Sequence, residues 1–205
     1  MADTKIVETI KKLNEGSKKR NFSQSFDLIV NLKNIDVKKP EGKVNEIVEL
    51  PNGRGKEASI AIFGDDVKSD CKTISTAEMD NLAKDKRGLR KLVNSVDFFM
   101  AEAKIMPIVG KSLGMTLAPR GRMPTIIVGD ADAMANRFKK STRVRIKDAP
   151  VIQCIVGTDS MPEEKIAENI DTVLRFLEKR LPKSRDNIKN VSIKLTMSKP
   201  VKIEL

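Results

Sequence analysis

The end of the chain, residues 191–205, limits how this sequence can fold more than any other stretch. Apolar Val191, Ile193, Leu195 and Met197 alternate with polar Ser192, Lys194, Thr196 and Ser198, and after Lys199-Pro200 the alternation resumes at Val201, Ile203 and Leu205. A period of two predicts a strand with one buried and one exposed face. The strand's N–H and C=O groups need partners, and the best candidates lie within residues 25–50. We therefore expect both chain ends to build one domain around an insertion, with function on the polar face of this strand.

The remaining patterns fit this plan. The outer segments predict helices over 4–20 and 162–181 and strands over 25–32, 44–50 and 151–156. Between them, strands over 58–63, 96–100 and 125–128 alternate with helices over 76–94, 104–113 and 132–140, and an alternating stretch over 141–147 precedes the return crossing at Ala149-Pro150. This rhythm predicts a small three-layer α/β domain with a parallel sheet, residues 59–150, inserted into a discontinuous α+β sandwich of residues 1–58 and 151–205.

Composition narrows the class of function. The 205 residues include no His, so the usual general base and the commonest zinc ligand are missing, and an enzyme is not expected. Lys and Arg number 39 against 28 acids, a formal net charge of +11. Such a surplus favours a polyanionic partner, most often nucleic acid, although an ordinary basic surface is the alternative.

The sequence also bears on compartment. No run approaches the ~18 apolar residues of a membrane span, and the segment 1–6 lacks the apolar core of a signal peptide. Cys71 and Cys154 are expected to be free thiols in a reducing cytoplasm.

Two possible ligand motifs are weak. Gly110-Lys111-Ser112 lacks the Gly that a phosphate-binding loop needs five residues earlier, where Ile105 stands. Asp65, Asp66, Asp130 and Asp132 are better explained as acids at strand ends and helix caps than as metal ligands. We expect no catalytic residue, no metal and no cofactor.

Three other stretches stay open on physical grounds. Pro119-Arg120-Gly121-Arg122-Met123-Pro124 is a stiff cationic loop that either binds phosphate or is only a basic turn. Phe22, at the mouth of the first strand, either packs in the core or stacks on a base. The segment 196–200 places hydroxyls and a cation at a bend fixed by proline.

Taken together, these stretches resemble the ribosomal protein L-one family of the large subunit in its archaeal form, over essentially the whole chain. The resemblance rests on the Phe22 segment, Leu50-Pro51-Asn52-Gly53-Arg54-Gly55-Lys56, the run from Asp97 to Pro124, and Thr196-Met197, in this order. It implies a Rossmann-like insertion that binds no nucleotide and moves on a two-strand hinge. Two positions differ, because the family has Gly where Ser198 stands and tends to have Gly at Ala118.

The resemblance also implies a function. It predicts binding to large-subunit ribosomal RNA at the mobile stalk beside the tRNA exit site, help in releasing deacylated tRNA, and repression of the protein's own mRNA, by a cytoplasmic protein that is monomeric when free and binds no membrane. The implied primary RNA surface consists of Phe22, Ser25, Asp27, Thr196, Met197, Ser198, Lys199 and Pro200. Arg120 and Arg122 are expected to make secondary contacts with RNA or tRNA.

Overall fold

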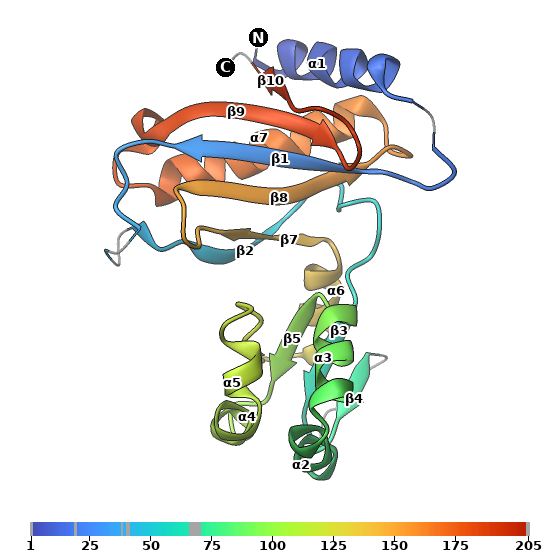
Figure 1. Ribbon diagram of the computed structural model, residues 1–205, viewed down its shortest axis with the longest axis vertical. Coiled ribbons are helices and arrows are strands. Elements are labelled where there is room, and N and C mark those ends of the chain that lie inside the picture. Colours follow the sequence, from blue (N-terminus) through green and yellow to red (C-terminus); the bar gives the residue numbers. More distant parts are fainter. Residues whose placement is uncertain (1, 19, 38, 40–41, 66–70, 204–205) are drawn as a thin grey trace. The chain divides into compact units, whose positions relative to one another are not determined.

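The computed structural model describes residues 2–18, 20–37, 39, 42–65 and 71–203, and it divides into two compact units (Figure 1). One unit joins both chain ends, Met1–Glu57 and Lys140–Leu205, and the other is Ala58–Lys139. Both mix helices and strands, which confirms the predicted mixed α/β fold class. The residues Asp66 and Leu205 discussed above lie outside the described part. Within that part, no helix has the length and apolar character that crossing a membrane requires.

The first unit is built on an antiparallel sheet in the order β10-β9-β1-β8. The strands are β1 (Ser25–Leu32), β8 (Val151–Thr158), β9 (Ile188–Leu195) and β10 (Val201–Ile203). The expected pairing of the tail with the first strand is confirmed, because β9 lies against β1 with Leu28 opposite Ile193. Two strands from opposite ends of the chain therefore lie side by side at the centre of the sheet.

Helices α1 (Ala2–Gly16) and α7 (Glu163–Arg180) pack in the same core as the sheet, and α1 contacts both α7 and β10. Their apolar stripes are buried with the inward residues of β1 and β9: Ile6, Ile10, Leu13, Ile166, Ile170, Val173, Leu177, Phe26, Leu28, Val30, Val191 and Ile193. Along β1 buried and half-buried residues alternate strictly, so Ser25, Asp27, Ile29 and Asn31 share the opposite face. That face carries the polar residues that the sequence analysis singled out.

The return crossing differs from the predicted position. Strand β7 (Ser141–Arg145) pairs antiparallel with β2 (Asn45–Glu49), and Ile146 N–H donates to the Val44 carbonyl at 2.8 Å. These bonds attach residues 140–150 to the first unit, so the crossing lies at Lys140 rather than after Pro150. The 3₁₀ helix η2 (Ser184–Asn187) then leads into β9.

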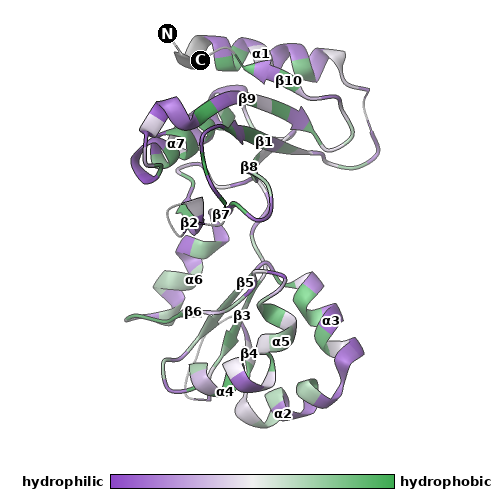
Figure 2. Ribbon diagram, turned by 60° about the vertical axis from the view of Figure 1, so that its left-hand side comes forward, coloured by the Kyte–Doolittle hydropathy of each residue, from purple (hydrophilic) through white to green (hydrophobic). Residues whose placement is uncertain are grey.

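The second unit has a parallel sheet in the order β4-β3-β5-β6. Its strands are β3 (Ile60–Phe63), β4 (Lys72–Ile74), β5 (Phe98–Ala101) and β6 (Thr125–Ile126). Strands β3 and β5 are hydrophobic and buried throughout, as expected of a parallel sheet covered on both faces (Figure 2). Residues from α2 to α5 pack with Phe63 and Phe99, whereas Phe138 of α6 (Ala131–Lys139) packs on Phe98. The unit therefore has three layers.

The predicted helix over 76–94 is wrong as a single element. It consists of α2 (Thr76–Lys84) and α3 (Lys86–Ser95), separated at Asp85, whose side chain accepts a hydrogen bond from Arg87 N–H at 3.0 Å. That bond makes Asp85 the N-cap of the second helix. Likewise the helix predicted over 104–113 is α4 (Met106–Ser112), and a short α5 (Gly114–Leu117) follows it.

Candidate nucleic-acid interface

Phe22 lies in the segment that enters β1, and 52% of it is exposed. Two neighbours fix this segment to Asp159, which follows β8: Ser23 Oγ donates to one carboxylate oxygen at 2.5 Å, and Gln24 N–H donates to the other at 2.9 Å. Asp159 N–H in turn donates to the Gln24 carbonyl at 2.9 Å. Of the two explanations open for Phe22, core packing is therefore wrong, and the ring is free to stack.

Ser25 and Thr196 join the first strand to the end of the tail strand. Thr196 Oγ1 accepts from Ser25 N–H at 3.1 Å and donates to the Ser25 carbonyl at 3.3 Å. Thr196 N–H also donates to that carbonyl, at 3.1 Å. A hydroxyl has one donor and two acceptor positions, so Thr196 Oγ1 keeps one acceptor position for a ligand.

Met197 projects from the turn after β9 and is 61% exposed. Its N–H donates to Gln24 Oε1 at 3.2 Å, and Gln24 itself is 5% exposed. Gln24 thus ties the Phe22 segment to the Met197 turn. Neither Gln24 nor Asp159 is predicted from the sequence, because neither belongs to a periodic pattern. The only signal in the sequence is a polar residue between an aromatic residue and a strand.

Asp27 lies on the outer face of the sheet, two residues along β1 from Ser25 and opposite Lys194 of β9. Partial burial raises the pKa of the Asp27 carboxyl, and the positive charge of Lys194 partly offsets that rise. Lys194 is therefore the cation beside this carboxylate. On the core side, burial and then the charge of Asp27 raise the pKa of the Cys154 thiol to about 12.

Ser198 closes the turn after β9 through hydrogen bonds to Leu195. Its Oγ accepts from Leu195 N–H at 2.8 Å, and its own N–H donates to the Leu195 carbonyl at 3.0 Å. Ser198 is not among the residues with positive φ, and Ala118 has φ −62°. Neither position therefore needs the backbone freedom of glycine. Lys199 and Pro200 follow, exposed to solvent.

The two arginines of the stiff loop belong to the second unit and make contacts there. Arg122 donates to the carbonyl of Val93 at 2.6 Å and also to that of Val96, at the C-terminal end of α3. Arg120 Nη1 donates to Asn94 Oδ1 at 2.8 Å. These bonds give the loop a structural role, since a cation on the last carbonyls of a helix is favourable.

The features that suggested other chemistry have local explanations. Asp65 accepts from the main chain and side chain of Thr76, which lowers its pKa, and Asp130 accepts from Asp132 N–H at 3.2 Å. In the part of the chain that the structure describes, no three His, Cys, Asp or Glu side chains are grouped to hold a metal ion.

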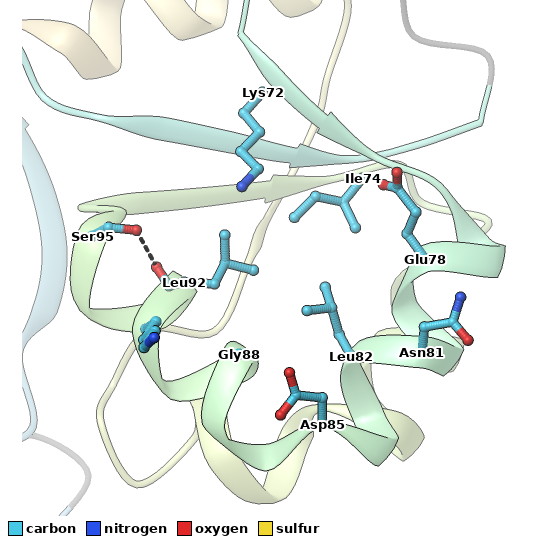
Figure 3. Close-up of a pocket in the computed structure, with 10 residues that line it drawn as sticks. Lys72, Ile74, Glu78, Asn81, Leu82, Asp85, Gly88, Leu92 and Ser95 are labelled. Carbon is cyan, nitrogen blue, oxygen red and sulfur yellow. Dashed lines mark hydrogen bonds between the residues drawn. The ribbon is translucent and has the colours of Figure 1, made fainter.

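A pocket of about 640 Å³ opens in the second unit between the edge strand β4 and helices α2 and α3 (Figure 3). Ile74, Leu82 and Leu92 form its apolar surface, and its charged lining mixes cations with acids: Lys72, Lys91, Glu78 and Asp85. In parallel α/β sheets, nucleotides bind beyond the carboxyl ends of the strands, with the phosphates at a glycine-rich turn. This pocket lies beside the edge strand β4 instead, so it does not have the arrangement of a nucleotide site.

The comparisons with known proteins all match one family of ribosomal proteins. The sequence profile described as "Ribosomal protein L1p/L10e family" matches residues 10–199. The chain is 44% identical to "Large ribosomal subunit protein uL1" of Methanobrevibacter smithii over 207 residues, which cover 97% of this chain and 98% of the relative. It is 40% identical to the protein of that name from Methanothermobacter thermautotrophicus, over 97% and 98% of the two chains. For the protein of that name from Pyrococcus abyssi the identity is 40%, over 98% and 95%.

Proposed function

The chain belongs to the ribosomal protein L1p/L10e family, and from that membership we propose that it binds large-subunit ribosomal RNA at the mobile stalk beside the tRNA exit site. Membership makes it a structural, non-enzymatic protein of the large ribosomal subunit, of the archaeal type, with the ribosome in the cytoplasm as its place.

One observation carries the proposal. Gln24 and Thr196 hold the Phe22 segment and the Met197 turn together, so that an exposed aromatic ring and an exposed thioether lie at the same end of one sheet. Folded RNA is recognised by its shape, by 2′-OH and phosphate contacts, and by unstacked bases placed on aromatic side chains. The Phe22 ring would stack on such a base, and Met197 would pack beside it.

Polar atoms around Phe22 and Met197 would bind the sugar-phosphate backbone. The free acceptor position of Thr196 Oγ1 and the Ser25 hydroxyl would bind 2′-OH groups, and the Asp27 carboxylate would accept from a 2′-OH or an amino group. Lys199 would contact phosphate, with Ser198 and Pro200 fixing its turn. Arg120 and Arg122 stay predicted as secondary contacts with RNA or tRNA.

The same surface would serve a regulatory role if the protein's own mRNA carries a similar fold. We propose repression of that mRNA, and help in the release of deacylated tRNA from the exit site, as consequences of stalk binding. Their support is the resemblance described above.

The test is a titration of the full chain with a stalk fragment of the ribosomal RNA and with a scrambled RNA of equal length, at two salt concentrations. We expect a strong preference for the stalk fragment that persists at the higher salt. Equal affinities that both collapse with salt would mean that counterion release is the whole interaction, and the proposal would fail.

Substitutions then test the surface. Met197→Ala and Thr196→Val should each weaken stalk binding by at least about 1 kcal/mol, through poorer packing or the absence of a hydrogen bond. Thr196→Ser keeps the hydroxyl and should bind nearly as wild type. Arg120→Ala should matter less; a larger loss there would make the second unit the main reader of RNA.

A further inference from the structure

We propose that a cationic groove beside helix α1 binds backbone phosphates of the RNA strand that leaves the Phe22–Met197 surface. The groove has a volume of about 450 Å³ and lies between the end of α1, the segment after it, and the turn that joins β9 to β10. Its cations are Lys12, Lys18, Arg20 and Lys199, and Leu13 and Val201 supply apolar surface. We call it the α1 groove. Only Lys199 among these cations belongs to the RNA surface proposed above, and the inference rests on that proposal.

The charge of the α1 groove is of one sign. No Asp or Glu is found among the described residues that line it. Among residues 2–18, 20–37, 39, 42–65 and 71–203, no carboxylate forms an ion pair with any of its four cations. By contrast the adjacent Lys11, on the same helix, is 4.0 Å from a carboxylate oxygen of Glu163. Unpaired like charges around one hollow repel each other, and a phosphate between them would relieve that repulsion.

The end of α1 is compatible with an anion nearby. The last carbonyls of a helix carry partial negative charge, which would oppose phosphate binding. Ser17 satisfies one of them, because its N–H and its hydroxyl both donate to the Asn14 carbonyl, at 3.3 and 3.0 Å. Lys18 and Arg20 follow directly, so the groove presents cations and hydrogen-bonded backbone to a ligand.

Continuity with the RNA surface identifies the ligand. Met197, Ser198 and Gln24 line the same groove. A nucleotide in contact with Met197 would therefore place a neighbouring phosphate in the groove that Lys12 and Lys18 line. The α1 groove carries unpaired cations and continues a surface on which bases would stack. The ligand that fits it best is therefore a phosphodiester backbone.

The experiment compares the salt dependence of stalk-fragment binding for the wild type and the variant Lys12→Gln/Lys18→Gln. Removing one lysine–phosphate interaction lowers the slope of log K against log salt by about 0.7–0.9, so the slope should fall by about one to two. The preference for the stalk fragment over the scrambled RNA should stay, because interactions with phosphate position the RNA without specifying its sequence. Arg20→Gln, an independent variant, should lower the slope by about one.

The matched control is Lys179→Gln/Lys183→Gln. These exposed lysines precede η2 and the start of β9, whereas the α1 groove lies beyond the other end of that eight-residue strand. The control removes the same charge and should leave the slope as in wild type. Thermal unfolding midpoints within about 2 °C of wild type, as expected for exposed substitutions, would show that all variants fold.

The outcomes separate the two proposals. If the wild type prefers the stalk fragment while the groove variants keep the wild-type slope, the α1 groove proposal is wrong and the RNA surface stands. A wild type without any preference would remove the proposed function itself. If inorganic phosphate raises the unfolding temperature of the wild type but not of Lys12→Gln/Lys18→Gln, and the RNA slopes agree, the groove takes a small anion rather than RNA, which also overturns the proposal.

Discussion

Asn169, fully buried in α7, donates from its side-chain amide to the carbonyl oxygen of Gly53 at 2.7 Å. The same amide nitrogen donates to the Val156 carbonyl of β8 at 2.8 Å, and its Oδ1 accepts from Asn52 N–H at 3.2 Å. One side chain thus fixes the Pro51–Lys56 segment, which precedes the crossing into the second unit, to both α7 and β8.

We predict that Asn169→Leu strongly destabilises the first unit. Leucine has a similar volume but leaves two carbonyls and one N–H without their partner, and each unsatisfied buried group costs about 1–3 kcal/mol. The midpoint of thermal unfolding should fall by at least about 5 °C. Lys179→Gln, on the exposed side of the same helix, is the control, and an equal midpoint for both variants would contradict the assigned role.

A second prediction concerns the two glycines of this segment, both with positive φ. A Cβ on Gly55 would lie 2.1 Å from Thr158 Oγ1, whereas one on Gly53 would meet only Lys140 side-chain carbons, at 3.8 Å or more. Gly53→Ala should cost only the backbone strain of about 1–2 kcal/mol. Gly55→Ala adds a clash in a packed site and should cost at least about 1 kcal/mol more. Chemical denaturation measures both, and equal losses would show that Thr158 moves aside freely.

The sequence predicts the first unit well where one periodicity dominates. Strand β1 lies where the alternation of polar and apolar residues places it, with Ile29 as the one exception to that alternation. Helix α7 lies where its apolar stripe places it. The return crossing was misplaced because β7 alternates but nothing in its own sequence says whether it pairs with β2 or enters the inserted sheet. Only the long-range pairing of Asn45 with Arg145 decides that.

For the candidate site, the residue types were readable but their connections were not. Phe22 and Met197 stand out in the sequence. The buried Gln24 joins their segments through a hydrogen bond from Met197 N–H, which is 173 positions away in the sequence. For Arg122 the structure adds a contact that the sequence does not indicate. A basic residue between glycine and methionine suggests a ligand, and only the position of α3 shows that its guanidinium binds main-chain carbonyls.

The two cysteines should react differently with a thiol reagent. Cys71 is partly exposed in the second unit, whereas Cys154 is buried in β8 with its pKa raised to about 12. Because the thiolate is the reactive form, one thiol should react with the reagent in the native protein and two after unfolding in denaturant. Cys71→Ser should abolish the native reaction and leave one thiol in the unfolded chain. A native reaction that survives this substitution would mean that β8 opens readily.

The last prediction is a pH dependence of stability that arises from Asp27. Burial raises the pKa of its carboxyl in the folded state, with Lys194 partly offsetting the rise. The unfolded chain therefore loses this proton at a lower pH than the folded chain does. The stability that the protonated carboxyl contributes is complete below the unfolded pKa, about 4, and is lost as the pH rises through the folded pKa. Asp27→Asn cannot ionise, and it should be more stable than wild type at pH 7, with the difference shrinking as pH falls to about 3.5. Asp148→Asn, whose side chain is 84% exposed in the wild type, removes the same charge and controls for net charge. An Asp27→Asn advantage that is absent at pH 7, or that is no smaller at low pH, would show that burial does not govern this carboxyl.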